Sequence, residues 1–249
     1  MLNKGGSMGQ ARLIIVTALS LLAFAANSII TRLALEETSI DEASFTLLRI
    51  GSGAAFLFLF LTLKKSQAII KQGSWLAAFS LFIYAMSFTY GYGMIAAGTG
   101  ALLLFGTVQI TMTIIGYLEG ERLNIIQMTG FFFALLGLVI LMLPGLTTPP
   151  LIGAILMCIS GMAWSIYSHM GRGANSPAKE TAGNFIKALP MALILWLSSH
   201  SYENFNSFHL DSLGITYALI SGIVTSGIGY IIWYSVLPEL KATQAAIVQ

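Results

Sequence analysis

Long apolar runs separated by short polar stretches dominate the chain. The runs cover residues 13–30, 43–63, 75–92, 99–117, 124–143, 151–170, 182–199 and 213–237. Each run is close to the ~20 residues that an α-helix needs to cross the hydrocarbon core of a bilayer. They are continuous rather than alternating, which predicts helices and not the strands of a barrel. The pattern therefore predicts an all-α polytopic membrane protein with eight spans, followed by a short segment, 243–249.

The composition excludes an ordinary soluble domain. Hydrophobic residues make up 56% of the chain and charged residues only 9%, with a mean hydropathy of +0.82. Soluble domains carry about 25% charged residues. The net charge of +2 comes without a basic patch, which argues against a nucleic-acid partner. Cys158 is the single cysteine, so an internal disulfide and a cysteine-built metal site are excluded.

The charges of the connecting segments alternate in sign. Basic residues mark the N-terminal tail and the loop with Lys64 and Lys65, whereas acidic residues such as Glu37 and Glu203 mark the intervening loops. We expect a protein of the cytoplasmic (inner) membrane, and the positive-inside rule then places its N-terminus in the cytoplasm. Nine of the twelve basic residues fall on that side, and the other three are Arg32, Arg49 and Lys187. Glu119 and Glu121 lie at the cytoplasmic end of the fourth span, where they are expected to pair with Arg122.

A weak internal repeat relates the two halves of the chain. Tyr90 aligns with Tyr234 at a shift of 144 residues, and Arg49 aligns with Lys187 at a shift of 138. Five spans per half is an odd number, so the halves are expected to enter the membrane from opposite sides, as in many transporters. The predicted boundaries are 1–145 for helices one to five, and 146–249 for helices six to eight with the start of helix nine. Because residues 243–249 are too short to cross a bilayer, we expect a truncated second half.

Several motifs carry a resemblance to a known family. The stretch Gly120-Glu121-Arg122-Leu123, followed by Gln127, Gly130 and Gly137, resembles the entry to the fifth helix of EamA-type permeases of the drug/metabolite transporter superfamily. Further matches are Asn27 in the first helix, Leu48-Arg49 in the second, and the segment 241–246 at the ninth. The resemblance implies ten helices in two inverted five-helix repeats, around a central cavity that opens alternately to either side.

Uncharged polar residues inside the spans are the candidate substrate ligands. None of the ten acidic residues lies inside a predicted span, so proton coupling through a buried carboxylate is not expected. Polar side chains are costly when they face lipid, so Asn27, Gln109, Trp164 and Asn184 are predicted to line a site near the membrane midplane. Gln109→Ala and Trp164→Ala are then expected to reduce transport without affecting folding. Hydrogen bonding between helices is the competing interpretation of these residues.

Four further residues are predicted to act at the mouths of the cavity. Arg49 and Lys187 are the only basic residues well inside spans, each about one turn from a membrane boundary. They either gate the two mouths, bind an anionic substrate group, or extend their charged ends to the interface without a functional role. We expect both residues to lie at the mouths of the cavity and not to contact the transported substrate. Tyr90 and Tyr234 are assigned to gating as well, with interface anchoring as the alternative.

The favoured function is a secondary transporter of small metabolites that works by alternating access. Amino-acid-like or amphipathic compounds are the candidate substrates, and the uncharged site favours zwitterionic or neutral solutes. One alternative is a membrane-embedded enzyme acting on lipid-linked substrates, which would need a cluster of His, Asp, Glu or Cys at one membrane face. The other is an inactive fragment of a permease. We expect no catalytic residue, metal or cofactor. The expected partners are the lipid bilayer and a small-molecule substrate. The protein is expected to be a monomer or a homodimer.

Overall fold

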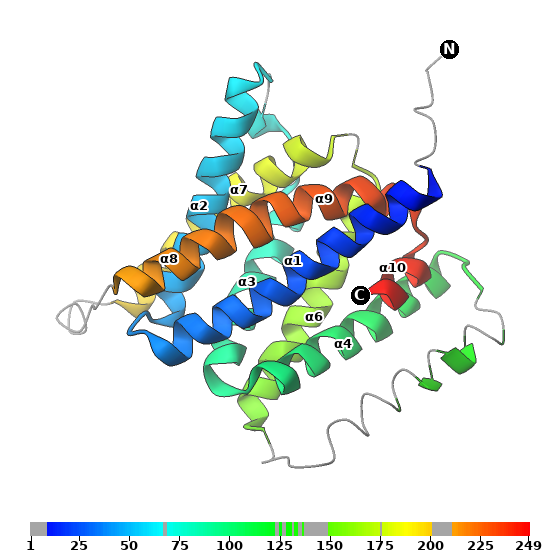
Figure 1. Cartoon of the computed structure of the whole chain (residues 1–249), viewed down its shortest axis with the longest axis horizontal. Coiled ribbons are helices and arrows are strands. Elements are labelled where there is room, and N and C mark those ends of the chain that lie inside the picture. Colours follow the sequence, from blue (N-terminus) through cyan, green and yellow to red (C-terminus); the bar gives the residue numbers. More distant parts are fainter. Residues whose placement is uncertain are drawn as a thin grey trace.

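The computed structural model describes residues 9–66, 69–122, 149–174, 176–200 and 211–249, together with residues 125, 128–130, 132–133 and 136. Over these residues the regular structure is entirely helical (Figure 1). The fifth predicted span, 124–143, falls largely outside them, as do Gln127 and Gly137 of the family motif and the loop residue Glu203.

Long helices account for most of the described chain. They are α1 (Gln10–Glu37), α2 (Glu42–Leu63), α3 (Trp75–Met94), α4 (Ala97–Leu118), α6 (Leu151–Gly171) and α7 (Pro177–Ser199). A further long helix consists of α8 (Ser212–Ile220), a π-helical segment, η3 (Ser221–Ile228), α9 (Gly229–Val236) and a short 3-10 turn, η4 (Leu237–Glu239). A 3-10 turn, η1 (Ile69–Lys71), precedes α3, and α10 (Ala242–Val248) is the last element.

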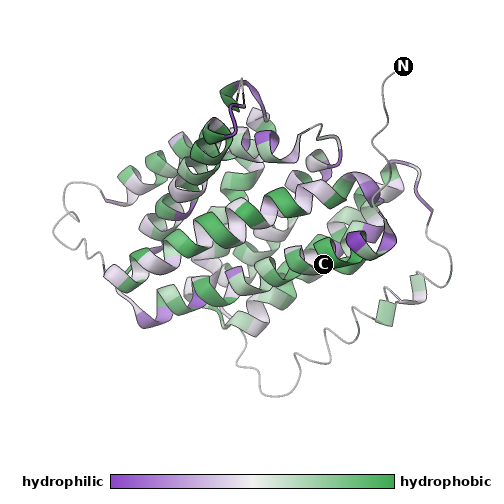
Figure 2. Cartoon of the chain, turned by 45° about the horizontal axis from the view of Figure 1, so that its top comes forward, coloured by the Kyte–Doolittle hydropathy of each residue, from purple (hydrophilic) through white to green (hydrophobic). Residues whose placement is uncertain are grey.

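Six of the described helices are long and apolar enough to cross a membrane: α1, α2, α4, α6, α7 and the continuous helix Ser212–Glu239. Apolar residues cover the length of these helices, whereas polar residues concentrate near their ends (Figure 2). The 20 residues of α3 would also rise about 30 Å, but α3 carries several polar residues, among them Ser80, Tyr84 and Ser87. These residues are buried, because α3 packs against α6 and α7.

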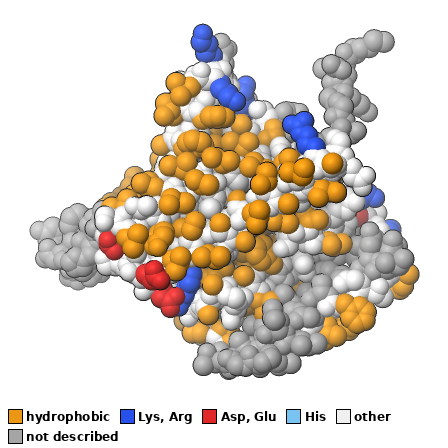
Figure 3. Space-filling view, viewed as in Figure 1, with side chains coloured by type: hydrophobic (Ala, Val, Ile, Leu, Met, Phe, Trp, Pro, Cys, Tyr) orange, Lys and Arg blue, Asp and Glu red, His pale blue; other side chains and the backbone are white. Residues whose placement is uncertain are grey.

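The loops meet at two opposite ends of the bundle. At one end, the Gly73 N–H donates to Glu180 and Arg172 pairs with Glu119, which brings three loops together. At the other end, Asp41 pairs with His200. Acidic side chains gather at the lower left of Figure 3, with a basic side chain beside them, and other basic side chains lie at its top and right, with an apolar surface between. The protein thus has two charged ends and an apolar middle.

Packing between the helices follows a recurring pattern. α3 lies against α6, the continuous helix of α8 and α9 lies against α1, and α2 lies against α7. Small residues allow close approach: a Cβ added to Gly161 of α6 would lie 2.6 Å from the Leu104 carbonyl oxygen of α4. Helices in a membrane associate through such packing, because lipid tails are as apolar as the side chains.

Candidate functional site

Arg49 is the centre of the most polar part of the interior. It lies on α2 with 1% of its surface exposed. Its Nε donates to Ser226 Oγ at 3.0 Å, and its Nη2 donates to the hydroxyls of Tyr230 at 2.8 Å and Tyr84 at 3.3 Å. The guanidinium also lies over the rings of Tyr84 and Phe88, at 5.3 and 5.1 Å from their centroids. The side chain is directed inward and is held by groups from three other elements. The expected role of Arg49 at a mouth of the cavity stays a prediction.

The π-helical segment η3 positions the polar partners of this centre. Its Ser221 and Thr225 hydroxyls donate to Asn27 Oδ1 of α1, at 2.7 and 2.9 Å. Its Ser226 hydroxyl accepts the bond from Arg49. A π-helix widens the turn and changes which side chains share a face, and such segments recur at functional sites. η3 thus connects α1 and α2, because its hydroxyls bond to Asn27 of α1 and to Arg49 of α2.

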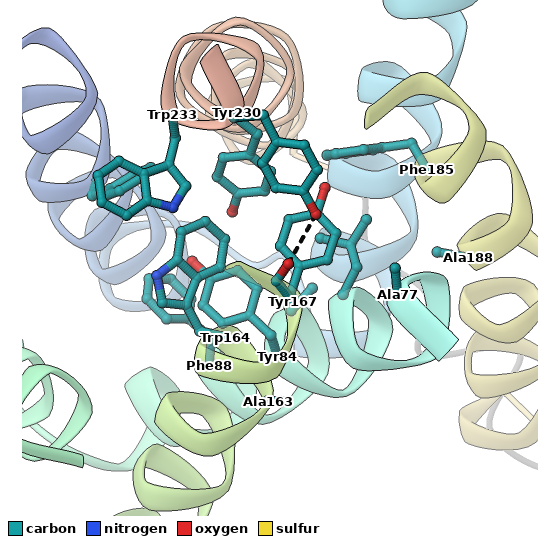
Figure 4. Close-up of a cluster of buried hydrophobic side chains, with 14 of the residues drawn as sticks. Ala77, Tyr84, Phe88, Ala163, Trp164, Tyr167, Phe185, Ala188, Tyr230 and Trp233 are labelled. Atoms are coloured by element: carbon teal, nitrogen blue, oxygen red, sulfur yellow. Dashed lines mark hydrogen bonds between the residues drawn. The ribbon is translucent and has the colours of Figure 1, made fainter. Parts of the chain in front are cut away.

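Aromatic rings gather in the interior beside these polar groups, and Figure 4 shows Tyr84, Phe88, Trp164 and Tyr230 among them. The ring of Trp164 on α6 lies 4.8 Å from that of Tyr84, 4.9 Å from that of Tyr230 and 5.0 Å from that of Phe24. We define the central cluster by these side chains and the polar residues that they enclose: Phe24, Asn27, Arg49, Tyr84, Phe88, Trp164, Ser221, Thr225, Ser226 and Tyr230. Its members come from α1, α2, α3, α6, η3 and α9, so both halves of the chain contribute.

The predicted substrate ligands do not all meet in this cluster. Asn27 and Trp164 belong to it, and the amide of Asn27 lies 3.5 Å from the Tyr84 hydroxyl. Asn184 instead accepts a bond from the Ser74 N–H at 3.0 Å, at the end of the bundle. Gln109 is half-buried on α4, and the described hydrogen bonds and ring contacts of the cluster do not include it.

The other predicted mouth residues lie apart from one another. Lys187 donates to the carbonyls of Gln72 and Gly73, at 2.5 and 2.8 Å, next to Asn184. Tyr234 is buried, and its hydroxyl donates to the Tyr167 carbonyl at 3.0 Å. Tyr90 lies towards the opposite end, where its hydroxyl is 3.4 Å from that of Ser199 on α7.

One end of the bundle is hollow. A cavity of about 170 Å³ lies between α3, α6, α7 and α9, and both Asn184 and Tyr234 line it. A wider cavity of about 460 Å³ adjoins it, shares Met170 and Gly173 with it, and is lined also by Glu119 and Arg172. We call these two cavities together the vestibule. Beyond Tyr234, the rings of Tyr167 and Trp164 lead from the vestibule to the central cluster.

The opposite end is closed by contacts between helices. Arg32 on α1 donates to the Tyr92 carbonyl of α3 at 2.7 Å and also pairs with Glu36. Trp196 on α7 donates to Ser44 of α2 at 3.0 Å. These contacts join four helices at this end, whereas the vestibule lies at the other end.

Glu121 docks the last helix at the vestibule end. Its carboxylate accepts bonds from the Ala242 and Thr243 N–H groups and from the Thr243 hydroxyl, at 2.8–3.1 Å. Partial burial disfavours the charged form, but these bonds and the positive charge of Arg172 outweigh it and lower the pKa of Glu121. Both Glu119 and Glu121 pair with Arg172, and not with Arg122 as predicted, because α4 and α6 end side by side.

Tyr84, Phe88 and Phe24 were not among the site residues predicted from the sequence. One signal was present: α3 is unusually rich in hydroxyl-bearing residues for a membrane span. Within the part of the chain that the structure describes, no group of three or more His, Cys, Asp or Glu residues could hold a metal ion.

A bundle of long apolar helices around a buried polar centre defines a polytopic membrane protein. Residues 11–143 and 151–249 both match the EamA-like transporter family, and the chain belongs to this family. The relationship confirms the resemblance found in the motifs.

The chain is also similar to individual proteins. The chain is 48% identical to the uncharacterized protein PA1977 of Pseudomonas aeruginosa, over 97% of this chain and 83% of that protein. It is 22% identical to the uncharacterized transporter YoaV of Bacillus subtilis, over 84% of this chain and 74% of that protein. A crystal structure with 19% identity superposes with a TM-score of 0.66 over 93% of this chain and 83% of the other, which shows a shared fold.

Proposed function

We propose that the protein is a secondary transporter that moves small amphipathic metabolites across the cytoplasmic membrane by alternating access. The observation that carries the proposal is the central cluster, to which helices of both halves contribute and which lies between a hollow end and a closed end. A transporter binds its cargo where both gates can reach it. The cluster meets this requirement, whereas Asn184 and Lys187 belong to the vestibule end.

The proposed architecture consists of two inverted five-helix repeats, with the first in residues 1–145 and the second in 146–249. Two observations support it. The family matches the chain in two segments that meet near this boundary. The packing of α3 on α6 also has a counterpart in the packing of α8 and α9 on α1, which is the pairing that an inverted repeat requires. Alternating access then corresponds to movement of one repeat against the other.

We place the vestibule end in the cytoplasm, because Lys64, Lys65 and Arg172 lie there. A single cysteine at position 65, in a Cys158→Ala background, should resist an impermeant thiol reagent in intact cells and react after the cells are broken. A cysteine at position 37 should react in intact cells. The opposite pattern would reverse the orientation.

Transport can be tested with the purified chain in liposomes loaded with the small-molecule fraction of an isotope-labelled cell extract. We expect faster release of label than from protein-free liposomes. Tyr90 and Ser199 offer a test of gating, because their side chains meet at the closed end. In a Tyr90→Cys/Ser199→Cys protein that lacks Cys158, a short bis-maleimide should abolish release by holding this end closed.

The two single-cysteine variants treated with the same reagent are the matched controls, and they should keep their flux. Absence of any flux above that of protein-free liposomes would refute the transport proposal. Undiminished flux after complete cross-linking would refute the alternating opening of this end.

A further inference from the structure

We propose that the central cluster binds the carboxylate of a monoanionic amphipathic solute, with Arg49 as its ligand. The inference rests on the proposed transport function and names the class of substrate. It replaces the expectation, drawn from the uncharged polar residues alone, of a neutral or zwitterionic cargo.

Arg49 is a buried cation with spare hydrogen-bonding capacity. Its Nη1 atom is buried and has no hydrogen-bond partner among the described residues. The partners of its other two nitrogens are hydroxyl groups, which carry no charge. The described acidic residues lie at the helix ends or in loops, and none of their carboxylates is within 4.0 Å of Arg49. A positive charge is therefore present at the centre of the bundle without a counter-charge from the described chain.

An unpaired charge in a membrane interior is costly, and such residues are normally paired or functional. Hydroxyl groups and aromatic faces reduce this cost for Arg49, but they leave its two Nη1 protons without an acceptor. A bound carboxylate would supply the missing acceptor and neutralise the charge. Arginine is well suited to this role, because its planar guanidinium matches the geometry of a carboxylate.

Neighbouring hydroxyls would complete the binding of the anion. The Tyr84 oxygen accepts bonds from Arg49 and, at 3.5 Å, from the Asn27 amide, so its own proton is available to donate. The Tyr230 hydroxyl accepts from Arg49 in the same way. Both hydroxyls lie within hydrogen-bond distance of the guanidinium and could donate to an anion bound to it.

The apolar side chains of the cluster indicate which kind of group the solute carries besides its carboxylate. The rings of Tyr84 and Phe88, over which the guanidinium lies, also line a small cavity. Its other lining side chains are mainly aromatic or aliphatic: Phe24, Ser28, Leu104, Phe105 and Trp164. Its volume of about 10 Å³ has room for about one water molecule, so the cluster is closed in this conformation. Separation of the two halves during transport would enlarge it, and the aromatic walls favour a solute with an apolar or aromatic body.

The charge of the site distinguishes a carboxylate from other polar groups. Arg49 contributes one positive charge, which one carboxylate cancels, whereas a phosphate dianion would leave a buried negative charge uncompensated. The described residues of the cluster include no carboxylate that could receive an ammonium group. These two considerations favour a monoanion over both a phosphate ester and a zwitterion.

Three probes with the same phenyl group test the inference: phenylacetate, its neutral amide phenylacetamide, which has nearly the same shape, and phenyl phosphate. Their dissociation constants can be measured on the purified full chain in detergent from the quenching of tryptophan fluorescence. We expect phenylacetate to bind at least about tenfold more tightly than phenylacetamide, because its carboxylate forms an ion pair with the guanidinium, whereas the amide oxygen is a neutral acceptor. Phenyl phosphate should bind more weakly than phenylacetate.

The variant Arg49→Gln should lose the preference for the acid, to within about twofold, while its affinity for the amide is retained. Retained binding of the amide separates a lost ligand from a lost fold. Arg49→Lys, which keeps the charge, should keep the sign of the preference at reduced affinity, and it serves as the test if Arg49→Gln does not fold. Arg12→Gln removes an exposed charge of the same sign and should behave as the wild type.

Equal affinity of the wild type for acid and amide, no measurable binding of the acid, or tighter binding of phenyl phosphate would each overturn the inference. So would an unchanged preference for the acid in Arg49→Gln. These outcomes are separable from those of the flux experiment. Liposomes that transport solutes without discriminating acid from amide would leave the transporter assignment intact, and binding of the acid without flux would refute only the transport function.

Discussion

Replacing Trp164 with alanine is expected to lower the free energy of unfolding by about 3–5 kcal/mol, as is usual for a buried Trp→Ala change. Only 3% of this residue is exposed, and its ring contacts those of Phe24, Tyr84, Tyr167 and Tyr230. We therefore expect Trp164→Ala to impair folding, in contrast to the expectation from the sequence that it would reduce transport alone. The effect can be measured as the midpoint of thermal or denaturant unfolding of the purified protein in one detergent.

Trp75 provides the matched control, because it begins α3 with 62% of its surface exposed. Trp75→Ala should change stability by only a few tenths of a kcal/mol. Trp164→Phe should recover most of the loss by keeping an aromatic ring against Phe24 and Tyr84. If Trp164→Ala and Trp75→Ala unfolded at the same midpoint, the tight central packing described here would be incorrect.

The change Gly222→Ala should destabilise the protein by about 1–3 kcal/mol, the usual cost of overpacking a well-packed interior. A Cβ at this position of η3 would collide with the Arg49 carbonyl and the Ser52 hydroxyl of α2. Backbone cannot rotate aside as a side chain can, so α2 and η3 must separate. This separation would also displace Arg49 from Ser226, and we expect flux in liposomes to fall together with the unfolding midpoint.

Gly98 is the control for the intrinsic effect of this substitution. It lies in α4, and a Cβ added there meets no other atom within 4 Å. Alanine is a better helix former than glycine by up to about 1 kcal/mol, so Gly98→Ala should be neutral or stabilising. A Gly222→Ala protein with unchanged stability and flux would show that α2 and η3 are not in close contact.

The positions of the spans along the chain could be predicted from the sequence. The predicted runs correspond closely to α1 to α4, α6, α7 and the helix formed by α8 and α9, because the cost of burying polar groups in lipid acts on each segment by itself. Their ends were less certain: α1 extends to Glu37, beyond the predicted residue 30. The grouping of charged loops at two ends also followed from the sequence, because the direction of the chain reverses at each span.

The neighbours of each side chain were decided only by the tertiary structure. Helices that are apolar on all sides do not reveal which face points to a partner, so counting residues along α2 suggested a position for Arg49 near a boundary. The packing of α2 against η3 directs its long side chain to Tyr84 and Tyr230 instead. Asn184 was predicted beside Asn27 on similar grounds, but α7 brings it to the loop before α3.

The amino-acid sequence by itself thus determined the class of protein, its helices, the two ends of the bundle and its family, because hydropathy, loop charge and motifs are local properties. The composition of the central cluster depended on contacts between residues as distant in the chain as Arg49 and Tyr230. Such contacts depend on the packing of whole helices, including a π-helical segment for which the sequence showed no signal. Only the tertiary structure placed Arg49 in the interior of the bundle, where its described hydrogen-bond partners are uncharged hydroxyl groups.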